Sequence, residues 1–235
     1  MSIDPPTLRL SAREAWIAPA YFAAYMASLF VSLESELHHW ITFVLLPLTL
    51  AFAFAPRDRR GLRAVLATFG LRRGNLRPGV GWALLLGAAV TVFQVTLGGR
   101  RDAIWELIRS GDALWLYPLT FVLMLLMAGF TEELFFRGFL QTRVERLVRS
   151  PWLAVAIVAV LFGVYHLPYA YLNPMWPSAG DWGAAWGAAM GNGVLGGVVL
   201  GPLYVLSRRN LLPCILLHSL INAAPAMTML NISFG

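Results

Sequence analysis

Residues 114–137 read LWLYPLTFVLMLLMAGFTEELFFR, and this stretch decides the fold class. No charge occurs in residues 114–130, and Glu132, Glu133 and Arg137 follow within the same apolar surroundings. An apolar run of about 17–25 residues is long enough to cross a bilayer as a helix. Ionisable side chains in such a segment are costly to bury, so they mark a functional site. The stretch therefore predicts a transmembrane helix that carries chemically active groups.

The composition of the whole chain supports the same fold class. The 235 residues are 58% hydrophobic and 13% charged, whereas globular domains are about 45–50% apolar and roughly 25% charged. All 18 basic residues are arginines, which give a net charge of +6. They fall in short segments between apolar runs, as positive-inside topology requires, and this pattern does not indicate nucleic-acid binding. The single cysteine, Cys214, excludes an intrachain disulfide, and its apolar surroundings predict a packing role.

We expect an all-α, polytopic transmembrane helix bundle of about seven spans, forming a single membrane domain over residues 1–235. The expected spans are 15–33, 40–55, 80–97, 114 through the two glutamates, 152–167, 182–206 and 211–230. Apolar side chains at helical spacing between flanking arginines predict an interfacial helix near residues 61–71, with a plain cytoplasmic connector as the alternative.

The arginines also predict the orientation. They precede the first span and lie between spans two and three, before span five and between spans six and seven. The remaining loops are acidic or mixed, so we expect a cytoplasmic N-terminus, a C-terminus outside, and an integral protein of the inner or plasma membrane. His38 and His39 follow the first span in a short outer loop, where we expect them to be solvated.

Two rows of glycines occur in the expected sixth span, at positions 183, 187 and 191 and at positions 193, 197 and 201. Rows of small residues at this spacing let transmembrane helices approach closely. We therefore predict helix packing, with a thin wall beside a substrate groove as the alternative.

Sequence spacing brings Glu132 opposite His166. If the helix that carries Glu132 continues to residue 149, Ser150-Pro151 forms the turn, since proline is favoured at the first position of a helix. Glu132 then lies roughly 27 Å before the turn and His166 roughly 24 Å after it. In an antiparallel hairpin the carboxylate and the imidazole reach similar heights.

On the last span, His218 and Asn222 share one helix face because they are four residues apart. They lie roughly 10–20 Å from the arginines that precede this span, so we expect the site in the inner half of the membrane. This depth leaves one difficulty. The segment from Pro168 to Gly180 would then run at membrane depth as irregular backbone, which is tolerated only when buried in protein or lining a cavity.

Three motifs in chain order resemble the motif set of the CAAX-processing and bacteriocin-processing protease family, also called CPBP or Abi, which includes the type II prenyl-protein endopeptidases. The resemblance covers about residues 114–225. The motifs are Glu132-Glu133-xxx-Arg137, Phe162-xxx-His166 and His218-xxx-Asn222.

The resemblance implies intramembrane hydrolysis of a peptide bond. Glu132 and His166 would activate the attacking water, and His218 and Asn222 would donate hydrogen bonds to the oxyanion. Such donors are effective in a site of low dielectric.

The resemblance also implies supporting roles. Glu133 and Arg137 would hold the charge and the helix geometry of the site, with a purely structural ion pair as the alternative. For Phe162, its position one turn before His166 predicts a packing role.

The main mechanistic alternative is a zinc-dependent version of the same protease, in which Glu132, His166 and His218 would bind Zn²⁺. The sequence lacks the HExxH spacing of zincins, and Asn222 is a poor zinc ligand, so we favour a metal-free glutamic mechanism without a cofactor.

The functional alternative is a membrane protein that binds a peptide without cutting it, such as an immunity protein. A transporter is disfavoured because the charged residues cluster at one level. The expected partners are the lipid bilayer and a membrane-associated substrate: a C-terminal sorting tail, a leader peptide or a prenylated tail.

Overall fold

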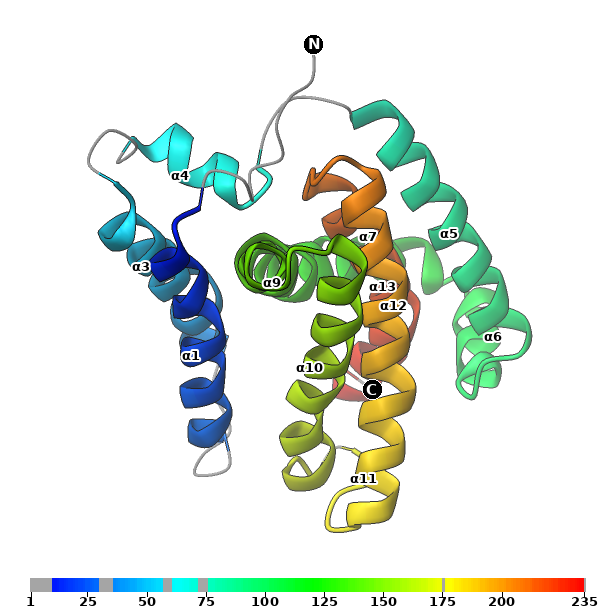
Figure 1. The fold of residues 1–235 in the computed structure, drawn as a ribbon. Helices are drawn as coiled ribbons and strands as arrows, with labels where there is room; N and C mark the ends of the chain where they lie inside the picture. Colours follow the sequence, from blue (N-terminus) through cyan, green and yellow to red (C-terminus); the bar gives the residue numbers. More distant parts are fainter. Residues whose placement is uncertain (1–9, 30–35, 57–60, 72–75, 175, 235) are drawn as a thin grey trace.

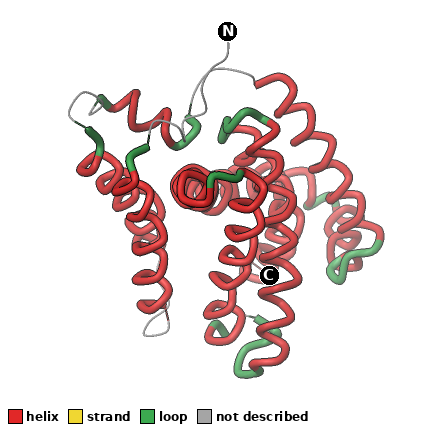
Figure 2. The backbone as a smooth tube through the Cα atoms, viewed as in Figure 1, coloured by secondary structure: helices red, strands yellow, loops and turns green. Residues whose placement is uncertain are grey.

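The computed structural model describes residues 10–29, 36–56, 61–71, 76–174 and 176–234, and within them every regular element is a helix (Figures 1 and 2). The predicted all-helical bundle is confirmed. The N-terminal elements are α1 (Ala12–Leu29), α2 (Glu36–Trp40), η2 (Ile41–Leu45), α3 (Leu46–Phe54), α4 (Leu62–Thr68), α5 (Leu76–Thr96) and α6 (Arg101–Ser110). The C-terminal elements are α7 (Ala113–Met124), η4 (Leu125–Phe130), α8 (Thr131–Glu133), η5 (Leu134–Gln141), α9 (Thr142–Val148), α10 (Pro151–Leu172), α11 (Trp182–Ala188), η6 (Ala189–Val194), α12 (Leu195–Leu206) and α13 (Leu212–Phe234).

Five helices are long and apolar enough to cross a membrane. They are Leu76–Thr96, Ala113–Val148, Pro151–Leu172, Trp182–Leu206 and Leu212–Leu230. The first two of the seven expected spans are not among them. Helix α1 carries Arg13 and Glu14 in its first turn, and the apolar helix His38–Phe54 is shorter. Residues 30–33 of the expected first span lie outside the described residues.

The helix Ala113–Val148 carries the glutamate pair through the middle of the bundle, where α9 lies between α1 and α10 (Figure 1). Its η5 segment is buried along its whole length, with Phe135, Phe136 and Phe139 at 0% exposure. These rings pack edge-on, tilted or stacked against aromatic side chains of other elements, such as Phe43, which is edge-on at 4.7 Å from Phe135. Aromatic burial of this kind is a large apolar contribution to stability, so the helix that holds the site is also the centre of the core.

The expected turn between the two site helices is present. Arg149 ends α9 in the left-handed region at φ 56°, Ser150 caps α10 by accepting the Leu153 N–H at 3.3 Å, and Pro151 occupies the first turn. Phe136 and Phe162, which lie at similar chain distances from this turn, pack with ring centroids 4.7 Å apart.

Helix α10 is longer than the sequence predicts. It passes through Pro168 and ends at Leu172, so the first five residues of the segment expected to be irregular are helical. A proline inside a helix removes one hydrogen bond and crowds the carbonyl four residues earlier, and burial of residues such as Ala170 offsets this cost and favours continuation. The following loop is tied back to α10, because Ser178 Oγ donates to the Ala170 carbonyl at 2.8 Å and the Gly180 N–H donates to the Tyr171 carbonyl at 2.9 Å.

The second glycine row packs helix against helix, as predicted. A Cβ added at Gly193 would lie 2.5 Å from Gly163 Cα, and one at Gly197 would lie 2.5 Å from Ala159 Cα. Helix α12 therefore meets α10 backbone to backbone. The first row differs, since added Cβ atoms at Gly187 and Gly191 would meet nothing within 4 Å.

Helix α4 forms within the range 61–71, and the location of this helix at a membrane interface stays a prediction. Its Val65 and the following Phe69 are buried in the core, whereas Leu62 is exposed. The Phe69 ring stacks on Phe139 at 5.8 Å, and the Arg143 guanidinium lies 5.0 Å from the Phe69 ring. These contacts anchor the segment in the fold.

Candidate active site

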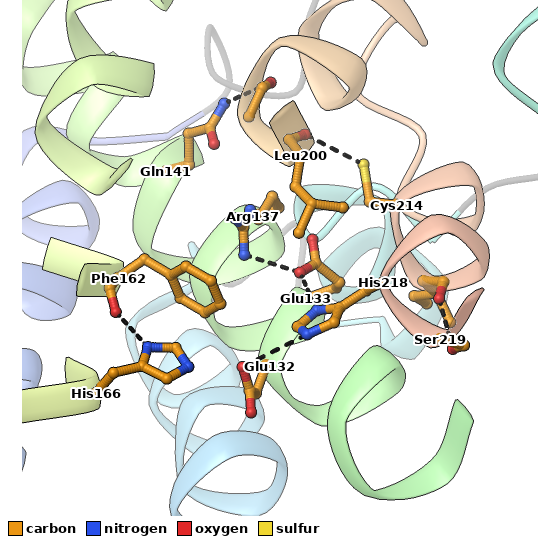
Figure 3. Close-up of polar contacts among 12 residues, drawn as sticks. Glu132, Glu133, Arg137, Gln141, Phe162, His166, Leu200, Cys214, His218 and Ser219 are labelled. Carbon is orange, nitrogen blue, oxygen red and sulfur yellow. Dashed lines mark hydrogen bonds and ion pairs between the residues drawn. The ribbon is translucent and has the colours of Figure 1, made fainter. Parts of the chain in front are cut away.

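The two glutamates hold one histidine between them. Glu133 Oε1 lies 2.7 Å from His218 Nδ1, and Glu132 Oε2 lies 3.9 Å from His218 Nε2 (Figure 3). Adjacent side chains on a helix point about 100° apart, and the His218 imidazole lies between the two carboxylates and contacts both. Short helix α8 carries the pair between two wide π-helical segments, η4 and η5, and π segments inside helices are frequent at functional sites.

Glu133 is fully buried and has a second partner. Its Oε1 accepts a hydrogen bond from Arg137 Nη1 at 2.8 Å, and the side chains of Glu133 and Arg137 are 0% and 1% exposed. An isolated buried carboxylate is very costly, and pairing with a guanidinium reduces that cost. The ion pair expected from the four-residue spacing is present, and the His218 contact shows that it also belongs to the cluster.

Phe162 separates the two histidines. Its ring is 4.7 Å from the His166 ring and 6.0 Å from the His218 ring, edge-on to both. The Arg137 guanidinium lies 4.5 Å from the same ring on another side. The sequence predicts packing for Phe162, and its contacts make it the spacer that holds both imidazoles and the guanidinium apart.

His166 faces Glu132 from α10. Figure 3 shows its ring beside the Glu132 carboxylate, and it interacts electrostatically with Glu132, His218 and Arg137. Its Nδ1 lies 2.7 Å from the Phe162 carbonyl oxygen. A carbonyl only accepts, so Nδ1 carries the proton and Nε2 of the neutral ring has a free lone pair. His218 Nδ1 donates to the Glu133 carboxylate, so its Nε2 faces Glu132.

Helix α13 reaches the glutamates because Gly129 lets it come close. A Cβ at Gly129 would lie 2.2 Å from Ser219 Oγ and 2.9 Å from the Ile215 carbonyl oxygen. Gly129 is one turn before Glu132, and Ser219 follows His218 directly. The close approach therefore sets the distance between His218 and the glutamates.

Asn222 lies one turn beyond His218 on α13 and is half-buried. Within the described part of the chain its side chain makes no hydrogen bond of its own, whereas His218 is bonded to Glu133. Glu132, Glu133 and His218 therefore form one contact group, which His166 faces from α10, and Asn222 lies one turn from His218 on the same helix.

His39 corrects one expectation from the sequence. It is 8% exposed and not solvated, and its Nε2 lies 2.9 Å from Thr131 Oγ1. The Thr131 hydroxyl donates to the Met127 carbonyl at 2.6 Å, so it accepts from His39. Its ring also packs on Phe43 at 4.3 Å. The apolar run that begins directly after His39 was the available signal, because it places His39 within a buried helix.

Cys214 is buried as expected, with Sγ 3.5 Å from the Leu200 carbonyl oxygen. Among the described residues, no group of three His, Cys, Asp or Glu side chains is arranged as a metal-ligand set. Among the side chains of Glu132, His166 and His218, the described structure has one ion contact, between His218 Nε2 and Glu132 Oε2 at 3.9 Å.

The fold and the buried glutamate–histidine cluster together define a polytopic helical membrane protein with the components of a hydrolytic site. Residues 114–224 match the family described as Type II CAAX prenyl endopeptidase Rce1-like. This segment contains every site residue predicted from the sequence, and the match confirms the resemblance inferred from the three motifs. It supports an intramembrane CAAX-type endopeptidase that acts on a membrane-associated protein in the bilayer. Comparison with curated proteins and with solved structures finds no match.

Proposed function

We propose that this protein hydrolyses a peptide bond of a membrane-anchored or membrane-embedded substrate, with water activated by Glu132 and His166. The observation that carries the proposal is the Glu133–His218–Glu132 arrangement, with distances of 2.7 Å and 3.9 Å on the two sides of one imidazole. An ion pair needed only for folding would not require the second carboxylate or a second histidine facing it.

Glu132 is the general base in this mechanism. Its carboxylate takes a proton from the water while the lone pair of His166 Nε2 accepts the water's other hydrogen. The oxygen then attacks the scissile carbonyl carbon and forms a tetrahedral oxyanion. Transfer of the same proton from Glu132 to the amide nitrogen lets the C–N bond break, which releases an acid and an amine. A base and acid of this kind typically contributes about 10²–10⁴-fold to the rate.

The oxyanion is stabilised by His218 and Asn222. A His218 ring with a proton on each nitrogen donates through Nε2–H to the oxyanion while its Nδ1–H donates to the Glu133 carboxylate. Asn222 contributes a neutral N–H from one turn away. Arg137 holds the Glu133 carboxylate in place through its 2.8 Å contact.

The test compares Glu132→Gln with Glu106→Gln, which changes an exposed glutamate on α6. The probe is an internally quenched, farnesylated CAAX peptide added to protein in lipid nanodiscs. We expect a loss of at least ~10²-fold for Glu132→Gln and none for Glu106→Gln. Near-native cleavage by Glu132→Gln would disprove the role of Glu132 as the base.

The same preparation separates the metal-free mechanism from the zinc-dependent one. We expect the purified, active protein to contain no stoichiometric zinc and to keep its activity with 1,10-phenanthroline. Stoichiometric zinc together with chelator-sensitive cleavage would favour zinc held by Glu132, His166 and His218. Tight binding of the peptide without any cleavage would favour the non-catalytic alternative.

A further inference from the structure

Helix α13 has a backbone break next to Asn222. Pro225 lies inside the helix and has no N–H, so the Ile221 carbonyl, four residues earlier, loses its helical donor. Gln94 of α5 replaces that donor, with Nε2 2.8 Å from the Ile221 oxygen. A carbonyl oxygen only accepts, so it is the N–H end of the amide that faces α13.

The carbonyl on the other side of Asn222 is contacted as well. Thr120 Oγ1 of α7 lies 3.1 Å from the Ala223 oxygen, and it also contacts the Leu116 and Tyr117 carbonyls of its own helix at 2.9 and 3.0 Å. Thr120 is fully buried. Side chains from two different helices thus contact the two carbonyls that flank Asn222.

We propose that Gln94 is a positioning residue for Asn222, acting by replacing the hydrogen bond that Pro225 removes from Ile221. The inference rests on the proposed role of Asn222 as an oxyanion donor. Helices bend at prolines, and without the Gln94 amide the Ile221 carbonyl at this bend loses the donor that replaces its helical hydrogen bond. Gln94 lies outside the matched segment 114–224, so it adds a residue of α5 to the site.

The variant Gln94→Leu keeps the approximate length of the side chain and removes the donor. We expect kcat on the farnesylated CAAX peptide to fall about tenfold with KM unchanged, since a displacement of ~1 Å can cost ~10²-fold and this turn remains partly supported by Thr120. Thr91→Val is the matched control on α5, because its hydroxyl bonds only the Gly87 carbonyl of its own helix at 2.9 Å.

A second substitution separates positioning from packing. Pro225→Ala restores a backbone N–H for Ile221, so Gln94→Leu should cost no more than about twofold in that background. An equal loss in both backgrounds would show that Gln94 acts through packing and would overturn the inference.

Glu132→Gln and Asn222→Ala are measured in the same assay. If Asn222→Ala leaves kcat unchanged, the oxyanion role of Asn222 in the proposed function fails and the inference fails with it. If Asn222→Ala lowers kcat while Gln94→Leu does not, only the positioning inference fails.

If the peptide is not cleaved, the position of Asn222 is tested directly by NMR. In protein labelled with [¹⁵N]Asn, the side-chain amide signal assigned by its loss in Asn222→Ala should shift in Gln94→Leu and return in Gln94→Leu/Pro225→Ala. An Asn222 signal that does not move in Gln94→Leu would overturn the inference.

Discussion

Replacing Gly129 with alanine should disable the site while leaving the protein folded. The added Cβ would lie 2.9 Å from the Ile215 carbonyl oxygen, which is part of the α13 backbone, and 2.2 Å from Ser219 Oγ. Ordinary contacts of a carbon atom are about 3.5–4.0 Å, so α13 has to retreat by roughly 0.5–1 Å. Ser219 can change its rotamer, but the Ile215 oxygen cannot move independently of the helix.

The retreat has a larger effect on activity than on stability. Overpacking costs about 1–3 kcal/mol, and the better helix propensity of alanine offsets about 1 kcal/mol of it. The net loss of ~0–2 kcal/mol corresponds to a Tm decrease of a few degrees, at roughly 2–4 °C per kcal/mol. His218 moves away from both glutamates, and a misplacement of about 1 Å can reduce the rate ~10²-fold.

The experiment measures Tm by intrinsic fluorescence and cleavage of the farnesylated CAAX peptide in nanodiscs. Gly81→Ala is the control, because a Cβ at Gly81 meets nothing within 4 Å; we expect it to keep full activity with an unchanged or higher Tm. Adding Ser219→Ala to Gly129→Ala removes the 2.2 Å contact but not the one at 2.9 Å, so rescue should be partial. Native activity in Gly129→Ala would refute the argument that the approach of α13 sets the site geometry.

Three further substitutions test other contacts. Glu133→Gln leaves the Arg137 charge buried without its partner and should cost about 3–5 kcal/mol of stability. The double variant Glu133→Gln/Arg137→Met should regain the Tm but not the activity. Recovery of activity in the double variant would mean that His218 needs no carboxylate. His39→Phe keeps a ring packed on Phe43 but loses the hydrogen bond to Thr131, so we expect the free energy of unfolding to fall by ~1 kcal/mol, measured by thermal unfolding. An unchanged Tm would show that the bond contributes nothing. Gly197→Ala should lower Tm and Gly187→Ala should not, since only the first Cβ meets the α10 backbone, at 2.5 Å; equal Tm values would contradict the close packing.

Local sequence features predicted much of what holds the site. Apolar runs predicted the five helices that are long and apolar enough to cross a membrane. Ser150-Pro151 predicted the turn, because the cap and the proline act on the first residues of the helix that follows. The four-residue spacing predicted the Glu133–Arg137 ion pair. Each of these depends on neighbours in the chain, which periodicity and spacing describe.

Contacts between distant segments could not be predicted in this way. The hydrogen bond of His39 to Thr131 joins residues 92 apart, and that of Gln94 to Ile221 joins residues 127 apart. No spacing rule relates such positions. The contact of both glutamates with His218 depends on the closeness of α13, which in turn depends on one glycine whose neighbours are not evident from the sequence.

The glycine contacts between α10 and α12 have a consequence for how a peptide enters. Backbones that meet at Gly193 and Gly197 leave no side chains that could slide or rotate to open a gap, and close-packed interfaces of this kind move as one body. This pair of helices is therefore a closed side wall, and under the proposed function a peptide that diffuses in the plane of the bilayer has to reach Glu132 between other helices. His166 lies on α10, so it stays on that wall while a peptide enters elsewhere.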